Sequence, residues 1–251
     1  MEIFDFHLHP YYDFHGNDTD PHRFVDTLKK QGVTGCAGCG INMACQNHPT
    51  DEYDRVITEL NEKTWAFHSL FPDFFVPGIH IHPDHVDHSV KEMQKHKERG
   101  GILVGELVYY MMGWRYLHKN TLSLMQTARD MDMVVSVHPS KDFEYVEAVA
   151  DNIKGIKLVV AHLDAYGLYE RQLALIKKHE NVYADLSAYG AEREGMIADA
   201  VNRVGSEKIL YGSDFPGYSV SKFINAVEKA DISTADKENI LYKNAKRLLF
   251  V

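Results

Sequence analysis

The sequence predicts an α/β fold, a (β/α)8 TIM barrel, from two observations. Short apolar runs rich in β-branched residues alternate with amphipathic helical stretches, and eight such pairs are the number that closes a parallel barrel. The length of 251 residues agrees, because barrels of this kind run to about 250 residues. Residues 1–251 contain no linker, low-complexity tract or internal repeat, so we expect a single domain.

Each expected strand is a short apolar segment, and an expected helix follows each one. The strands cover residues 3–9, 33–39, 75–82, 102–108, 133–138, 157–162, 182–187 and 208–212. The helices cover 20–31, 52–68, 84–99, 120–131, 141–151, 169–179, 192–203 and 219–230, and a final helix covers 235–249. The longest irregular stretches, 10–19, 40–51 and 109–119, each follow a strand, at the end of a barrel where active sites are built.

Composition and charge narrow the classes of function. The chain has 27 Lys and Arg against 36 Asp and Glu, a formal net charge of −9, which argues against a nucleic-acid partner because such binding neutralises phosphates. No apolar run approaches the roughly 20 residues of a membrane helix. The odd set Cys36, Cys39 and Cys45 predicts no disulfide framework, and no signal peptide follows Met1, so a cytoplasmic location is expected.

Two histidines stand two residues apart near the start of the chain, in FDFHLHP at 4–10. Side chains two apart on a strand share a face, so His7 and His9 would both point into the barrel. Neutral imidazoles placed in this way suit one divalent transition metal. The alternative is a pair of buried, hydrogen-bonded structural histidines.

Four more metal-capable side chains lie at the ends of other strands. Glu106 ends ILVGE, His138 ends MVVSVH, His162 ends KLVVAH, and Asp214 follows ILYGS. An apolar core tolerates such groups only when they are paired or bound to metal. Because the ends of parallel barrel strands meet, the sequence favours a catalytic metal site formed by His7, His9, Glu106, His138, His162 and Asp214.

Together with these residues, several motifs resemble the amidohydrolase superfamily, and most closely its amidohydrolase-2 branch, which includes the aminocarboxymuconate-semialdehyde decarboxylases. The motifs are DFHLH at 5–9, SVH at 136–138, VVAHL at 159–163, VYADLS at 182–187, ILYGSDFP at 209–216 and ILYKNAKRLL at 240–249. The resemblance implies that His7, His9, His138 and Asp214 are metal ligands. It implies that His162 is either a ligand of a second metal or an acid–base residue facing the substrate.

Two departures from the family pattern concern the site. Many binuclear relatives carry a carboxylated lysine on strand four, where this chain has Glu106 in VGEL. That glutamate, and GIHIHP at 78–83, are similar to TatD-like deoxyribonucleases. In AHLDAYG, Asp164 stands where the family pattern has glycines. This difference affects the substrate contacts that the family pattern implies, but not the metal ligands.

The main expectation is therefore a metal-dependent hydrolase of a small molecule with an amide, ester or lactone bond. A divalent metal lowers the pKa of bound water from about 16 to near 7, and Asp214 would be the general base for that water. If the Glu106 carboxylate bridges two metal ions, then Glu106, His138 and His162 would hold the second ion. If it does not, His162 is an acid–base group. The histidine-rich set favours Zn2+, with Mn2+, Fe2+, Co2+ or Ni2+ as alternatives.

Two other activities compete with hydrolysis. A non-oxidative decarboxylase of an aromatic or muconate-type acid is the first alternative, and Arg115 is the candidate cation for its substrate carboxylate. A TatD-like phosphodiesterase is the second, which the acidic composition disfavours. The sequence does not decide between these activities or reveal the substrate, and a homo-oligomer is left open.

Several further residues are expected around the substrate. His80 and Trp114 are candidate substrate-binding residues. An aromatic set either forms a wall over the site or packs its loop: Tyr109, Tyr110, Trp114 and Tyr116. Asp185 and Ser187 share one face of the seventh expected strand, and we expect them to orient pocket water or the ligands.

Overall fold

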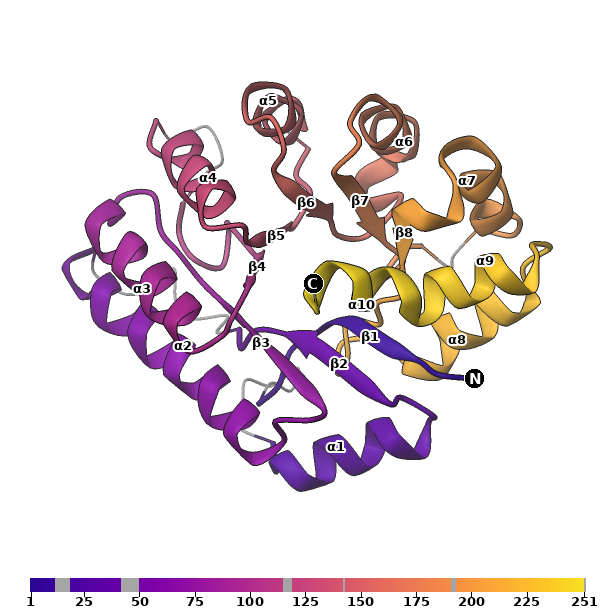
Figure 1. The fold of residues 1–251 in the computed structure, drawn as a ribbon, viewed down its shortest axis with the longest axis horizontal. Coiled ribbons are helices and arrows are strands. Elements are labelled where there is room, and N and C mark those ends of the chain that lie inside the picture. The colour runs from indigo at the N-terminus through magenta and orange to yellow at the C-terminus, as the bar shows by residue number, and fades with distance from the viewer. Residues whose placement is uncertain (12–18, 42–49, 115–118, 142, 191–192, 251) are drawn as a thin grey trace.

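The computed structural model describes residues 1–11, 19–41, 50–114, 119–141, 143–190 and 193–250. Within them, eight parallel strands stand in chain order, each paired with the next (Figure 1). The strands are β1 (Phe4–Leu8), β2 (Gly35–Gly38), β3 (Phe75–Ile79), β4 (Leu103–Leu107), β5 (Val134–Val137), β6 (Lys157–Val160), β7 (Val182–Asp185) and β8 (Ile209–Leu210).

The last strand returns to the first. The Phe6 amide donates to the Tyr211 carbonyl at 3.0 Å, and the His9 amide donates to the Phe215 carbonyl at 2.9 Å. Leu8 and Phe215 form a parallel bridge. These bonds bring the two edges of the sheet together, which confirms the predicted (β/α)8 barrel.

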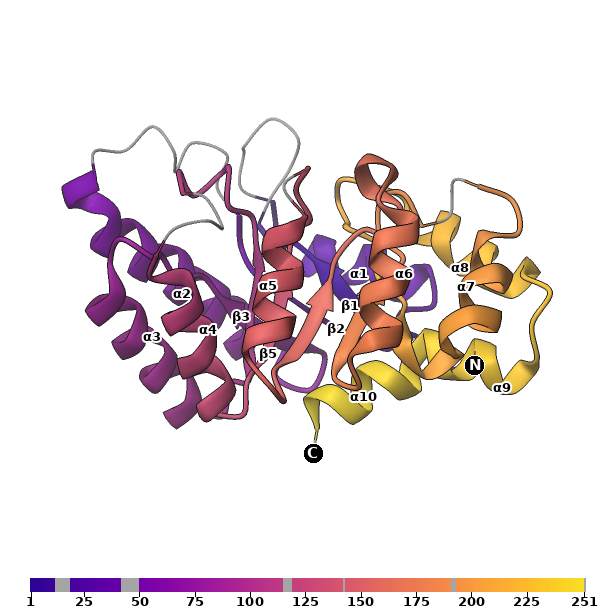
Figure 2. The same ribbon diagram turned by 90° about the horizontal axis from the view of Figure 1, so that it is seen from above.

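Helices surround the strands, and the last helix lies across one end of the barrel (Figure 1 and Figure 2). They are α1 (Pro21–Lys30), α2 (Tyr53–Leu70), α3 (Val86–Glu98), α4 (Thr121–Asp130), α5 (Glu144–Asn152), α6 (Tyr169–Lys178), α7 (Met196–Val204), α8 (Val220–Lys229), α9 (Thr234–Glu238) and α10 (Asn244–Leu249). Shorter helical turns are η2 (Thr50–Glu52), η3 (Ala165–Gly167), η4 (Ser206–Lys208) and the π-helical η5 (Asn239–Lys243).

Local chemistry explains where several elements begin and end. At the start of α1, the Asp20 carboxylate accepts the Arg23 amide at 2.7 Å and Pro21 takes the first helical position. The helix expected from 192 begins only at Met196, because Gly195 has a φ of 75° that a right-handed helix cannot include. The helix expected from 141 begins at Glu144, and η5 divides the expected final helix.

The two ends of the barrel differ in character. Inside it, apolar side chains from the strands pack against α10 and form an interior cluster of Phe4, Phe6, Ala37, Leu103, Val134, Val159, Leu210, Ala245, Leu248 and Leu249. Figure 2 shows α10 across the end of the barrel opposite the loops that follow the strands. The apolar filling therefore occupies one end and leaves the other end for polar groups.

A larger apolar core lies between the strands and the surrounding helices, with Leu28, Ile57, Met93 and Phe223 among its fully buried members. None of the helices within the described ranges combines the length and the hydropathy that a bilayer-spanning segment requires.

Candidate metal centre

Side chains from the two edges of the barrel meet at the end opposite α10. The Nε2 atoms of His7 and His9, from β1 and the residue after it, lie 3.3 Å apart. Asp214, which follows β8, places Oδ1 3.8 Å from the Nε2 of His7 and 3.3 Å from that of His9. These three residues offer ligand atoms that all lie within 4.8 Å of one another.

Glu106, on β4, connects this group to two further histidines. Its Oε2 lies 3.2 Å from the Nε2 of His7 and 3.5 Å from that of His9. Its Oε1 lies 2.9 Å from Nδ1 of His138 and 3.1 Å from Nε2 of His162, and these two nitrogens are 3.1 Å apart. Each oxygen of Glu106 therefore faces a different pair of histidines, and all six predicted residues come together.

The spacing of these atoms fits a transition-metal ion. Ligand atoms about 2.1 Å from a tetrahedral ion lie about 3.4 Å from one another. The separations between the Nε2 atoms of His7 and His9 and the Oδ1 of Asp214, from 3.3 to 3.8 Å, lie close to that value. A mixture of imidazole nitrogen and carboxylate oxygen suits divalent transition metals. The donor set therefore fits a divalent ion.

Three of the histidines are held by hydrogen bonds on the far side of the ring. The partners of Nδ1 are Asp185 Oδ2 for His7 at 2.9 Å, the Cys39 carbonyl oxygen for His9 at 2.9 Å, and Ser187 Oγ for His162 at 2.8 Å. Because these oxygens accept, each Nδ1 carries a hydrogen, so that each Nε2 could offer its lone pair to a bound ion. The arrangement agrees with the orienting role expected for Asp185 and Ser187.

The electrostatics of the cluster favour ionised carboxylates. Burial acts to raise the pKa of Glu106, but the charges of His7, His162 and His138 hold it well below its usual range. Burial also opposes ionisation of Asp214, yet the hydrogen bond from His9 and the charges of His7 and His162 hold its pKa below the ordinary value. Ionised Glu106 and Asp214 are the forms that bind a cation.

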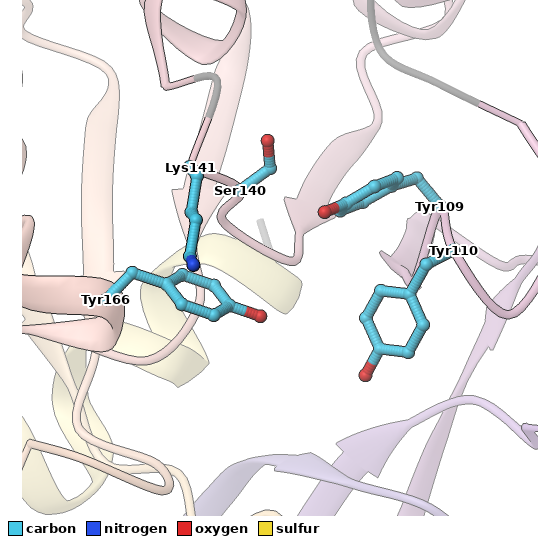
Figure 3. A pocket seen from close by; sticks show the side chains of 5 residues that line it. All are labelled: Tyr109, Tyr110, Ser140, Lys141 and Tyr166. Carbon is cyan, nitrogen blue, oxygen red and sulfur yellow. The ribbon is translucent and has the colours of Figure 1, made fainter.

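A cavity of about 350 Å³ lies beside His138. Tyr109, Tyr110, Ser140, Lys141 and Tyr166 line it, from loops that follow β4, β5 and β6. The Tyr166 hydroxyl lies 3.4 Å from Nε2 of His138, and the ring centroids of Tyr110 and His138 are 5.3 Å apart. Figure 3 shows Tyr109 and Tyr110 on one side of the cavity and Tyr166 and Lys141 on the other.

The predicted substrate-binding residues lie elsewhere or outside the described part of the chain. His80 is only 1% exposed, and its Nε2 lies 2.9 Å from the Gly40 carbonyl oxygen. Trp114 is buried, with its ring centroid 6.4 Å from that of His82. Neither residue is among the described residues that line the cavity beside His138, so their substrate contacts stay predictions. Arg115 and Tyr116 lie outside the described residues.

Sequence reasoning did not select Lys141 or Tyr166. Lys141 lies three residues beyond His138, and Tyr166 lies four residues beyond His162. A position just after a barrel strand is the signal that could have found them. Many loop residues share that position, so only the structure distinguishes these two. Tyr109 and Tyr110, expected either in a wall or in loop packing, do line the cavity.

Comparison with known proteins adds a family and a set of similar folds. The amidohydrolase family model matches residues 5–251. No curated protein matches this chain.

Three solved structures illustrate the similar folds. The 2,6-dihydroxybenzoate decarboxylase from Rhizobium is 15% identical with a TM-score of 0.76, covering 99% of this chain and 98% of that one. The 5-carboxyvanillate decarboxylase from Sphingomonas paucimobilis is 10% identical with a TM-score of 0.76, covering 99% and 98%. A dihydroxybenzoic acid decarboxylase from Polaromonas sp. JS666, with bound manganese and the inhibitor 2-nitroresorcinol, is 15% identical with a TM-score of 0.77, covering 99% and 96%.

Proposed function

This chain belongs to the amidohydrolase family, and from that premise we propose that it is a metal-dependent, non-oxidative decarboxylase of a hydroxylated aromatic acid. The observation that carries the proposal is the tyrosine-lined cavity against His138, and through it against Glu106. The named activities of solved structures with this fold, dihydroxybenzoate and 5-carboxyvanillate decarboxylation, support the same class of substrate. The manganese in one of them supports a divalent metal.

The cavity suits a single aromatic ring. At about 350 Å³ it lies near the lower end of the roughly 300–1,000 Å³ range of small-molecule sites. The rings of Tyr110 and Tyr166 would contact a flat substrate, and their hydroxyls would bind its oxygen substituents. A site of this size and composition does not favour a phosphodiester polymer, in agreement with the acidic net charge of −9.

In the proposed reaction, the metal donors hold the ion and Asp214 transfers the proton. A divalent ion held by the histidine and carboxylate cluster would supply Lewis acidity to the carboxylate and adjacent hydroxyl oxygens of the substrate. Asp214, ionised at rest, accepts the proton of that hydroxyl and delivers it to the ring carbon that bears the carboxylate. The bond from that carbon to the carboxylate then breaks, its electron pair restores the aromatic ring, and carbon dioxide leaves.

His162 is the candidate for the second acid–base role. Burial acts against its charged form, but the Glu106 carboxylate beside it raises its pKa above the ordinary value. When its Nε2 binds no ion, His162 can carry a proton there and donate it. We assign it to the substrate's phenolate oxygen, which must regain its proton when the product leaves.

Hydrolysis through a metal-activated water is the second candidate, and one observation favours it. The two oxygens of Glu106 face different pairs of histidines, with His7 and His9 on one side and His138 and His162 on the other. A carboxylate in that position can bridge two ions, and two-ion sites activate water for hydrolysis.

Product analysis separates the two candidates. Manganese-loaded protein is incubated with a panel of hydroxybenzoates and carboxyvanillates, with release of carbon dioxide measured, and with a parallel panel of esters and lactones, with acid release measured. We expect carbon dioxide from at least one aromatic acid, and loss of that activity by at least about 100-fold in Asp214→Asn. Ester or lactone hydrolysis without carbon dioxide release would favour the second candidate.

Asp132→Asn is the matched control. Like Asp214, with a φ of 59°, Asp132 has a positive φ, of 56°. It is exposed and lies between α4 and β5, away from the donor cluster. It should keep wild-type kcat. Metal content per chain, measured on the same samples, distinguishes a lost proton carrier from a lost ion.

A further inference from the structure

Among the described residues, one charged side chain lies in the wall of the cavity beside His138. Of the five lining residues, four are tyrosine or serine and only Lys141 carries a charge. Lys141 is exposed, and no carboxylate within the described part of the chain forms an ion pair with its amine. In Figure 3 its side chain extends along the cavity wall toward Tyr166. The amine is thus available to a ligand.

The position of Lys141 relative to the metal donors defines what it can bind. His138 is mostly buried and contacts Glu106, and it lies against Tyr110 and Tyr166 of the cavity wall. Lys141 comes three residues later in the chain and is exposed, so it lies toward the mouth. A carboxylate held at the buried metal donors would leave the exposed amine of Lys141 for a second group of the substrate.

The charge around the site makes a local cation necessary for a substrate with two negative groups. The donor cluster contains the acidic side chains Glu106 and Asp214, and the chain as a whole has a formal net charge of −9. An ion at the metal site offsets part of this charge at the buried donors only. A second anionic group at the mouth needs a cation of its own, since Coulomb repulsion from an acidic protein opposes its approach.

We infer that Lys141 forms a subsite for a second anionic group of the substrate, and that the enzyme prefers aromatic acids with a carboxylate remote from the one that is lost. The inference rests on the proposed function for the identity of the reacting group. It goes beyond that function by naming Lys141 as the specificity-determining residue, which would favour an aromatic dicarboxylate over a monocarboxylate such as a dihydroxybenzoate. The second carboxylate would accept hydrogen bonds from the Lys141 amine.

Binding of non-reacting probes tests the subsite without turnover. Isophthalate has two carboxylates and benzoate has one, and neither carries the hydroxyl group that the proposed reaction needs. Calorimetry with manganese-loaded protein should show isophthalate binding at least about tenfold more tightly than benzoate. Lys141→Met should reduce that preference to within about threefold, and Lys141→Arg should keep most of it.

Lys154→Met is the matched control, because it removes the same charge from an exposed lysine between α5 and β6. It should leave the preference unchanged. Thermal melting and manganese content establish that each variant is folded and loaded. A wild-type preference below threefold, or a preference that Lys141→Met retains, overturns the subsite. If the protein prefers isophthalate through Lys141 but decarboxylates none of the acids tested, only the proposed reaction is overturned.

Discussion

Ser187 orients two histidines at once. Its Oγ lies 2.8 Å from Nδ1 of His162 and 3.1 Å from Nδ1 of His7, and it also contacts a carboxylate oxygen of Asp185. The hydroxyl has one hydrogen, which it donates to Asp185, so it accepts from the imidazoles. Both histidines therefore carry hydrogen on Nδ1, which leaves their Nε2 atoms, beside Glu106, to bind an ion.

Ser187→Ala should weaken metal binding. Loss of the hydroxyl leaves His162 without its Nδ1 acceptor, so that the ring and its tautomer are less well defined. We expect about 10–100-fold lower affinity for Mn2+, the range typical of groups that hold metal ligands, measured by competition with a chelator. Ser206→Ala is the control, since Ser206 is also buried and donates to an aspartate, Asp236 at 2.6 Å, away from the cluster. An unchanged affinity in Ser187→Ala would contradict the orienting role.

Along a strand, side chains normally point alternately into and out of the barrel. Interruptions of this alternation decide which side chains enter the site. On β1, Phe4 and Phe6 belong to the interior cluster, so strict alternation would turn His7 away from the interior. The register with β2 shifts between Asp5 and Leu8. On β4, where Leu103 belongs to the same cluster, the register with β5 shifts between Val104 and Leu107. The shifts re-aim His7 and Glu106 into the barrel.

Gly105 is required by the second of these shifts. Its φ is 100°, and an added Cβ would lie 2.2 Å from the Ser136 carbonyl oxygen. Gly105→Ala should therefore lower the free energy of unfolding for two reasons, the positive φ and the close contact with Ser136. The contact should add at least about 2 kcal/mol to the cost of the positive φ, and it should displace Glu106. Urea unfolding of metal-free protein measures the first effect, and manganese content per chain measures the second.

Gly100→Ala separates the two contributions. Gly100 has a similar φ of 87°, but an added Cβ there meets no atom of the described chain within 4 Å. It should cost only roughly 1–2 kcal/mol and retain full metal content. Equal behaviour of the two variants would show that the close approach to Ser136 is unimportant.

For the whole molecule, closure of the barrel and assembly of the metal centre are the same event. The Asp214 amide donates to the His7 carbonyl at 2.8 Å, so the bond that joins the two edges also places the Asp214 carboxylate beside His7 and His9. The remaining donors come from the ends of β4, β5 and β6. An unfolded chain has no such site, so metal binding must stabilise the folded barrel.

Removal of metal should lower the melting temperature. An ion at 100 times its Kd stabilises the folded state by about 2.7 kcal/mol, which corresponds to a shift of roughly 5–10 °C for a chain of this size. Calorimetry before and after chelation measures the shift. His9→Ala should abolish it, whereas His88→Ala, on α3 and hydrogen-bonded to Thr58, should keep it. A melting temperature insensitive to chelation would contradict a bound structural or catalytic ion.

Much of this protein could be predicted from sequence because the relevant signals are local. The alternation of apolar strands with amphipathic helices determined the (β/α)8 barrel, and metal-capable residues at strand ends identified the side chains of the cluster. The alternating pattern of DFHLH correctly placed His7 and His9 together, with Nε2 atoms 3.3 Å apart.

Tertiary structure decided what depends on contacts between distant parts of the chain. The hydrogen bond between His7 and Asp185 joins residues 178 positions apart, and no local pattern specifies it. The register shifts that turn His7 and Glu106 inward depend on neighbouring strands. The cavity with Lys141 exists only where loops after three strands meet. Local sequence determines which elements form and which chemistry they carry, but packing between them determines which atoms meet.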